Sequence, residues 1–117
     1  MYETYVGNKQ FQPKDEPVFN RIADAGQEYG ATTGRRRQTN WMNMQLLEKA
    51  IRMNGVTHVV FNKVDVLREV GAWAVIDEEK VIQFKNEKGI KDFIVKRLAK
   101  LDIPRAKIFF SENKEGI

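Results

Sequence analysis

Two short segments of the chain combine polar and charged side chains at spacings that suit specific chemistry. The first, Asn62-Lys63-Val64-Asp65, has the form N-K-x-D. An ionised Asp accepts hydrogen bonds from the N1–H and the exocyclic 2-amino group of guanine, a donor pair that adenine lacks. The stem of Lys63 can lie over such a base, and Asn62 can tether the loop. The alternative interpretation is a solvated turn in which Asp65 caps the next segment.

The second segment, Thr32-Thr33-Gly34-Arg35-Arg36-Arg37, joins two hydroxyls and a glycine to three guanidinium groups. Hydroxyl and amide groups beside an Arg cluster can bind a carboxylate or a phosphate through paired hydrogen bonds, and Gly34 permits close approach of the backbone. Runs of Arg also occur on solvated surfaces and at nucleic-acid contacts. An anion site and a solvated basic patch are therefore both open for this segment.

The sequence around these segments predicts an α/β fold. Apolar residues at helical spacing predict a helix over about 41–54, and the β-branched run over 56–61 predicts a buried strand that leads into Asn62. Residues 1–34 have little periodicity, which predicts loops with short extended pieces. Further patterns predict a hairpin, a helix and a last strand, at 72–76 with 81–84, at 90–101 and at 107–110.

The strands near 57–61 and 107–110 are expected to be parallel. Ligands of such sheets bind beyond the carboxyl ends of the strands, so the segments that begin at Asn62 and Ser111 are expected on the same rim. Backbone N–H groups after Ser111 would then donate to the guanine carbonyl oxygen. His58 lies in an apolar run without a catalytic partner in sequence, and we interpret it as a residue of the core or of the sheet face.

Composition limits the class of protein. A chain of 117 residues is long enough for one domain or a piece of one. With no Cys and one His, it lacks disulfides, thiolate zinc sites and Cys nucleophiles. Residues 1–34 hold three basic and five acidic side chains, so the net charge of +4 arises after Gly34 and favours an anionic partner. No apolar run approaches the roughly 20 residues that cross a bilayer, so we expect a soluble, cytoplasmic protein without membrane contact.

Three segments together resemble a known family. They are Gly26 to Arg37, then Trp41, then Asn62 to Leu67. Their order and spacing closely resemble the carboxyl-terminal part of the adenylosuccinate synthetase family, which reads G-x-E-x-G-A-T-T-G-R-x-R-R, a Trp, and T-K-L-D-V-L. A weaker match to the family's V-G-x-G-P-F-P-T-E segment is formed by Tyr5-Val6-Gly7, Phe11 and Pro13.

The resemblance implies a fold and a set of contacts. The family joins aspartate to inosine monophosphate, using GTP to phosphorylate the purine 6-oxygen before the aspartate amine displaces it. The resemblance implies a P-loop-NTPase-like α/β fold with a partial parallel or mixed sheet and flanking helices. Residues 1–40 would form a loop-rich substrate segment, and residues 41–117 a base-binding segment. By position, the resemblance implies that the backbone of Val6 and Arg35 contact the ribose of the monophosphate, and that Thr32, Thr33 and Arg37 bind the aspartate carboxylates. It also implies that Lys63 and Asp65 contact guanine, and that Ser111 and Gly116 belong to the loop over that base.

Several departures from the family pattern bear on these expectations. The family's G-W-F-D is Asn40-Trp41-Met42-Asn43 here, which alters the monophosphate pocket, and its S-T-G-P is Ser111-Glu112-Asn113-Lys114. The stretch between Leu67 and Lys107 is also short, as in a compact variant. Related synthetases with another purine monophosphate, or with ATP as the donor, remain alternatives.

A larger departure concerns the phosphate loop. No segment of these 117 residues resembles the family's G-D-E-G-K-G-K. Phosphoryl transfer requires such a loop to bind Mg²⁺ and the γ-phosphate. The chain alone is expected to be inactive, as a fragment, a split-gene product or a degenerate relative. GTP is then a co-substrate, and Mg²⁺ belongs only to the complete enzyme.

The expected partners follow from this interpretation. They are a purine nucleotide, aspartate, an amino-terminal portion or complementary chain, and further copies of the chain in a homo-oligomer, whereas nucleic acid is not expected. The alternative is a non-catalytic module that binds guanine nucleotides or another protein. A relationship to small GTPases, from N-K-V-D and the segment after Ser111, leaves Thr32 to Arg37 unexplained.

Overall fold

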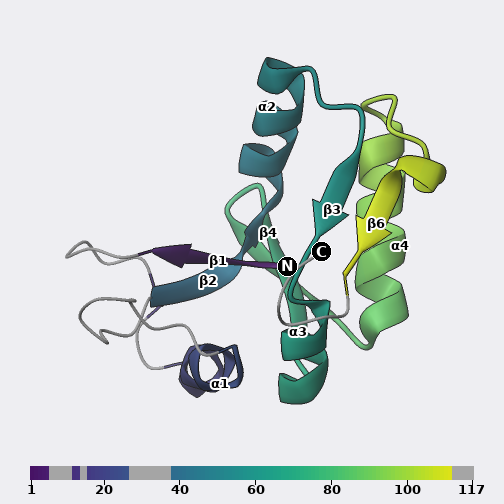
Figure 1. The fold of residues 1–117 in the computed structure, drawn as a ribbon. Coiled ribbons are helices and arrows are strands. Elements are labelled where there is room, and N and C mark those ends of the chain that lie inside the picture. The colour runs from purple at the N-terminus through teal and green to yellow at the C-terminus, as the bar shows by residue number, and fades with distance from the viewer. Residues whose placement is uncertain (6–11, 14–15, 27–37, 112–117) are drawn as a thin grey trace, which may run out of the picture.

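The computed structural model describes residues 1–5, 12–13, 16–26 and 38–111, which form an α/β arrangement of short strands and four α-helices (Figure 1). None of the helices in these ranges is long and apolar enough to span a membrane. In chain order the elements are β1 (Tyr2–Tyr5), α1 (Pro17–Ala25), β2 (Gln38–Asn43), α2 (Met44–Asn54), β3 (Val59–Phe61), α3 (Val64–Val70), β4 (Trp73–Asp77), β5 (Lys80–Phe84), α4 (Glu87–Ala99), the 3-10 turn η1 (Arg105–Lys107) and β6 (Ile108–Phe110).

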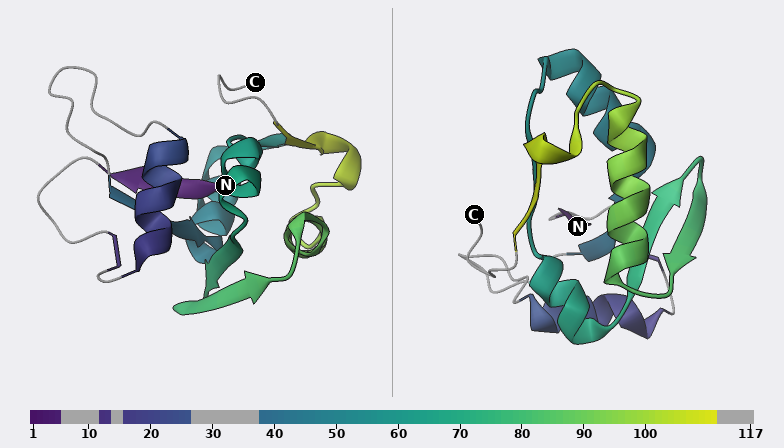
Figure 2. Two further views of the ribbon diagram at one scale, coloured as in Figure 1. Left: turned by 90° about the horizontal axis from the view of Figure 1, so that it is seen from below. Right: turned by 90° about the vertical axis from the view of Figure 1, so that its right-hand side faces the viewer.

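The strands form two sheets. Four of them make a mixed sheet in the order β1-β2-β4-β5, in which only the β2–β4 pair is parallel. The strands β3 and β6 form a separate parallel pair. The left view of Figure 2 shows α1 and α4 on opposite sides of the molecule. The expected mixed sheet with flanking helices is therefore confirmed.

Several predicted elements are present. The hairpin forms from β4 and β5, and the strand that ends at Phe61 is parallel to the last strand, as expected. The helix predicted over about 41–54 begins later, at Met44, because the preceding residues form β2. The Asn43 side chain accepts a hydrogen bond from the Leu46 amide at 3.2 Å, which satisfies a free donor of the first turn and fixes this start.

Two helices were not predicted. Residues 17–25 were expected to be loop, but they form α1, with Pro17 in the first turn and with Phe19, Ile22 and Ala23 buried at helical spacing. The polar segment after β3 was also expected to be loop, and it contains the short helix α3. In both cases burial of a few apolar side chains outweighs the polar composition of the segment.

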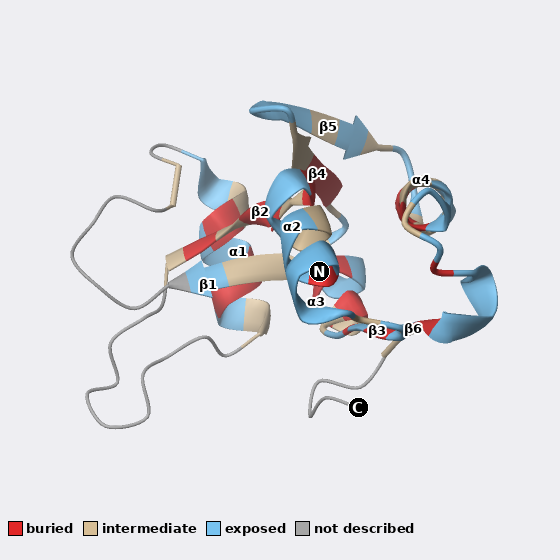
Figure 3. Ribbon diagram, turned by 90° about the horizontal axis from the view of Figure 1, so that it is seen from above, coloured by how far each residue is buried: buried red, intermediate tan, exposed pale blue. Residues whose placement is uncertain are grey.

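The core lies between the helices and the two sheets, as the red positions in Figure 3 show. Aromatic contacts connect its parts. The Phe19 ring on α1 packs on Trp41 of β2 with centroids 5.0 Å apart, and Phe61 of β3 stacks on Phe110 of β6 at 5.3 Å. Strand β5, at the edge of the mixed sheet, alternates between exposed and partly buried residues.

A group of charged side chains joins α2, β4 and α4, and we call it the Arg97 cluster. The Arg97 guanidinium donates to Glu48 Oε1 at 2.6 Å and to both oxygens of Asp77. Gln45 Nε2 donates to Asp77 Oδ1 at 2.6 Å. The hydrogen bonds from Arg97, and secondarily the one from Gln45, lower the pKa of Asp77 against the opposing effect of burial. The cluster therefore stabilises the charged carboxylate.

A second ion pair joins α3 to the first turn of α4. Arg68 donates two hydrogen bonds of 2.7 Å to the Glu87 carboxylate, and the Lys91 ammonium lies 2.6 Å from the same group. The Arg68 hydrogen bonds are the largest cause of a Glu87 pKa of about 2, below its ordinary 4.5. The position of Glu87 in the first helical turn also favours its negative charge.

Candidate functional site

The carboxyl ends of β3 and β6 bring the two predicted loops together. Phe61 and Phe110 are paired in register, and the Ser111 amide donates to the Phe61 carbonyl oxygen at 2.8 Å. The chain therefore leaves both strands at the same edge, with Asn62 next to Ser111. The expectation that these segments share one rim is confirmed.

The backbone at Lys63 makes a tight change of direction. Lys63 is the N-cap of α3 and adopts a left-handed conformation, with φ 60° and ψ 28°. This conformation is sterically costly for a residue with a side chain, and such residues concentrate at functional sites. It allows the chain to pass from β3 into α3 within two residues, so that Asp65 falls in the first helical turn.

One oxygen of Asp65 is buried and has no hydrogen-bond partner within the described residues. This is the Oδ1 atom. The interpretation of Asp65 as the cap of the next segment does not account for this atom, because the N-cap of α3 is Lys63 and no side chain caps that helix. A buried, unsatisfied carboxylate oxygen is costly and calls for a specific explanation. A ligand with N–H donors is one.

Met1 and the first residue of β1, Tyr2, contact the same loop. The amino group of Met1 donates to the Asn62 carbonyl oxygen at 2.6 Å. The Lys63 ammonium lies over the Tyr2 ring, 5.4 Å from its centroid. Sequence reasoning did not identify Tyr2, because it lies far from the loop in the chain and meets Lys63 only in the folded protein.

The other predicted site residues lie outside the described ranges. They are Val6, Thr32, Thr33, Arg35, Arg37 and Gly116. Of the predicted set, the structure places Asn62, Lys63, Asp65 and Ser111, and it brings these four to one rim.

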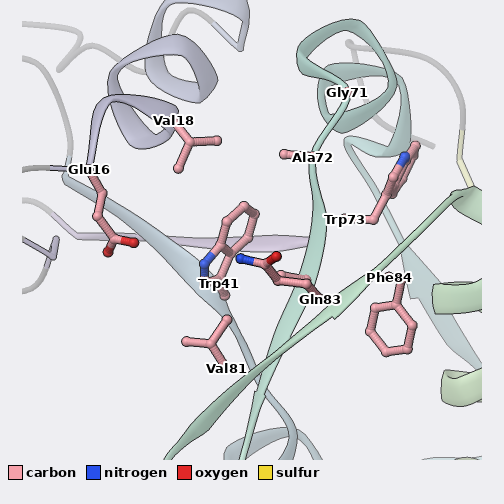
Figure 4. A pocket seen from close by; sticks show the side chains of 10 residues that line it. Glu16, Val18, Trp41, Gly71, Ala72, Trp73, Val81, Gln83 and Phe84 are labelled. Carbon is pink, nitrogen blue, oxygen red and sulfur yellow. The ribbon is translucent and has the colours of Figure 1, made fainter.

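A separate cavity of about 350 Å³ lies between the start of α1 and the strands β2, β4 and β5 (Figure 4). The side chain of Trp41 borders it together with Val18, Val81 and Gln83. Among the described residues that line it, Glu16 is the single charged one. An anionic nucleotide would meet a carboxylate there, so we do not assign a phosphate group to this cavity.

The part of the chain that the structure describes contains no cluster of side chains that could bind a metal ion. No three Asp, Glu or His side chains gather within those residues in a way that could hold one. The Mg²⁺ of the complete enzyme, implied by the family resemblance, therefore does not fit the described residues.

Comparison with known proteins places most of the chain in one family. The model of the family described as adenylosuccinate synthetase matches residues 1–99. The adenylosuccinate synthetase of Desulfatibacillum aliphaticivorans is 49% identical over 67 residues, which cover 56% of this chain and 16% of that protein. The protein of the same name from Monosiga brevicollis is 41% identical over 70 residues, again 16% of its length.

A solved structure extends the likeness to almost the whole chain. The fully ligated adenylosuccinate synthetase from Plasmodium falciparum matches 97% of this chain and 36% of its own, with a TM-score of 0.70 and 20% identity. At that identity the match establishes the fold. The matched segments span about one sixth of the length of the curated relatives, and Ser111 lies beyond the family match. Because the family match covers most of the residues, the chain belongs to the adenylosuccinate synthetase family.

Proposed function

We propose that this chain forms the substrate- and guanine-binding portion of an adenylosuccinate synthetase-like ligase, which condenses aspartate with inosine monophosphate at the expense of GTP. One observation carries the proposal. The Oδ1 atom of Asp65 is buried without a partner among the described residues, in a loop of the form N-K-x-D at the carboxyl end of a parallel strand.

The chemistry of guanine suits this oxygen. Its N1–H and 2-amino groups would supply the donors that Asp65 lacks, whereas adenine offers a bare N1 acceptor that an ionised carboxylate repels. The Ser111 amide is already engaged with Phe61, so a donor to the guanine carbonyl from this loop comes from the Ser111 side chain or from the residues that follow. Lys63 supplies the stem beside the base.

The second substrate site is assigned on the family pattern. Thr32, Thr33 and Arg37 would bind the aspartate carboxylates, and Arg35 with the backbone of Val6 would contact the ribose of inosine monophosphate. Paired guanidinium hydrogen bonds suit a dicarboxylic amino acid.

The chain alone is proposed to be inactive. These 117 residues contain no glycine-rich phosphate loop, and phosphoryl transfer depends on such a cradle with its metal ion. Activity would require a complementary portion that supplies the loop, and no step assigned here uses bound Mg²⁺. A cytoplasmic location accords with this metabolic function.

Calorimetric titration of the 117-residue chain with GDP and ADP tests the proposal. We expect GDP to bind and ADP to bind far more weakly. The substitution Asp65→Asn should reduce GDP affinity by about 10- to 100-fold, because hydrogen bonds to a charged acceptor are lost and the new amide group presents a donor to a donor. Asp92→Asn, which removes the same charge from an exposed position on α4, should leave the affinity unchanged.

Other results would contradict the proposal. Equal affinity for GDP and ADP would exclude base recognition by Asp65. A folded chain that binds neither nucleotide would favour the alternative, a module that interacts with another protein. Two exposed apolar residues of this chain, Val60 on β3 and Phe109 on β6, are paired in register and favour that second function.

A further inference from the structure

The contact between Tyr2 and Lys63 joins two parts of the chain that are distant in sequence. An ammonium 5.4 Å from a ring centroid is within the range of a cation–π interaction. The ring is on a firmly held strand, because Tyr2 pairs in register with Trp41 of β2, and Trp41 is 5% exposed and packs on Phe19. The ring that the Lys63 ammonium faces thus belongs to the mixed sheet.

This position matters because of the neighbouring carboxylate. Lys63 precedes Asp65 by two residues, and a Lys ammonium is the natural counter-ion of a carboxylate oxygen that lacks a partner. An ion pair between them would occupy the acceptor that a base needs. In the structure the ammonium lies over Tyr2, and Asp65 Oδ1 has no hydrogen-bond partner within the described residues.

We infer that Tyr2 is a positioning residue, which holds the Lys63 ammonium away from Asp65 and so keeps the carboxylate oxygen available to a guanine base. The inference rests on the proposed function of the loop. Tyr2 acts through Lys63, and its effect is selective: it concerns ligands that bind through Asp65.

Variants of Tyr2 in the whole 117-residue chain test this inference. Tyr2→Leu removes the ring and keeps an apolar side chain, and it should weaken GDP binding by about three- to fivefold, the size expected for one cation–π contact. Tyr2→Phe keeps the ring and should bind GDP within about twofold of the unchanged protein. The weak binding of ADP should be the same in all three. If circular dichroism shows that Tyr2→Leu does not fold, Tyr2→Met replaces it.

A second substitution separates positioning from a general structural role. Lys63→Met removes the ammonium, so adding Tyr2→Leu to it should cause no further loss of GDP affinity. In the NMR spectrum without nucleotide, the ε-methylene protons of Lys63 should be shifted upfield by the ring in the unchanged protein and in Tyr2→Phe, and not in Tyr2→Leu.

Each contrary result identifies what fails. Unchanged GDP affinity in Tyr2→Leu, with the upfield shift lost, overturns the inference and leaves the proposed function intact. An equal loss of affinity with and without Lys63→Met also overturns it, because Tyr2 would then act by another route. If the unchanged protein does not bind GDP, the proposed function fails, and this inference fails with it.

Discussion

Two carboxylates in this molecule differ in whether their oxygens have hydrogen-bond partners. Asp77, at the end of β4, receives hydrogen bonds from Arg97 and Gln45 on both oxygens. Asp65, in the first turn of α3, has a buried oxygen without a partner among the described residues. A satisfied carboxylate contributes to stability, and an unsatisfied one reduces it. Asp77 joins three elements of the fold, whereas Asp65 Oδ1 is, under the proposed function, available to a ligand.

Breaking the Arg97 cluster should have the largest effect on stability. Arg97→Met removes the guanidinium, whose central carbon lies 5.1 Å from the centroid of the Phe93 ring, and leaves Asp77 and Glu48 without their main partner. We expect the free energy of unfolding, measured by urea denaturation, to fall by about 2 kcal/mol, less than for a fully buried pair.

A nearby Arg on α2 provides the control for that prediction. Arg52 lies 3.7 Å from the same Glu48, and its side chain is 65% exposed. Arg52→Met should lower the free energy of unfolding by less than about 0.5 kcal/mol. Equal effects of the two substitutions would contradict a special role for the Arg97 cluster.

Acid should weaken the second ion pair next. Because the pKa of Glu87 is about 2 in the folded protein and about 4.5 when unpaired, its contribution is complete above about pH 4.5 and is lost as the pH falls toward 2. For a partly exposed pair we expect a loss of about 1 kcal/mol. Denaturation of Glu87→Gln and of the unchanged protein at pH 7 and pH 3 measures it, and equal pH dependence in both proteins would argue against this assignment.

The substitution Asp65→Asn should cause the smallest change in stability, and any change should be an increase. Asp65→Asn removes a charge that is costly to bury without a partner, so the free energy of unfolding at pH 7 should stay the same or rise by up to about 1 kcal/mol. Thermal denaturation of Asp65→Asn beside Asp77→Asn sharpens the comparison. A marked loss of stability in Asp65→Asn would mean that this carboxylate is already satisfied.

Much of the fold was predictable where periodicity and position agree. The run before Asn62 and the run before Ser111 contain β-branched and aromatic residues, and parallel pairing followed from their order in the chain. The helix α1 was not predicted, because its buried face consists of three residues within a polar segment. The boundary at Asn43 was displaced because local apolar spacing cannot distinguish the end of a strand from the first turn of a helix.

The candidate site was predictable in its local part only. The N-K-x-D pattern identified Lys63 and Asp65 as a pair of neighbours in sequence. It could not identify Tyr2, since that residue lies far from Lys63 in the chain and meets it only in the folded protein. It also could not show that Asp65 Oδ1 is buried without a partner, which depends on packing around the whole first turn of α3.

The pairing of β3 with β6 has a consequence for the order of events during folding. Between Phe61 and its partner Phe110 lie α3, the β4–β5 hairpin and α4, and Met1 meets Asn62 across 61 positions. Such long loop closures slow folding, and contacts that depend on them form after local helices and hairpins. The rim that presents Asp65 should therefore be among the last parts of the chain to mature, after the β4–β5 hairpin and α4 are in place.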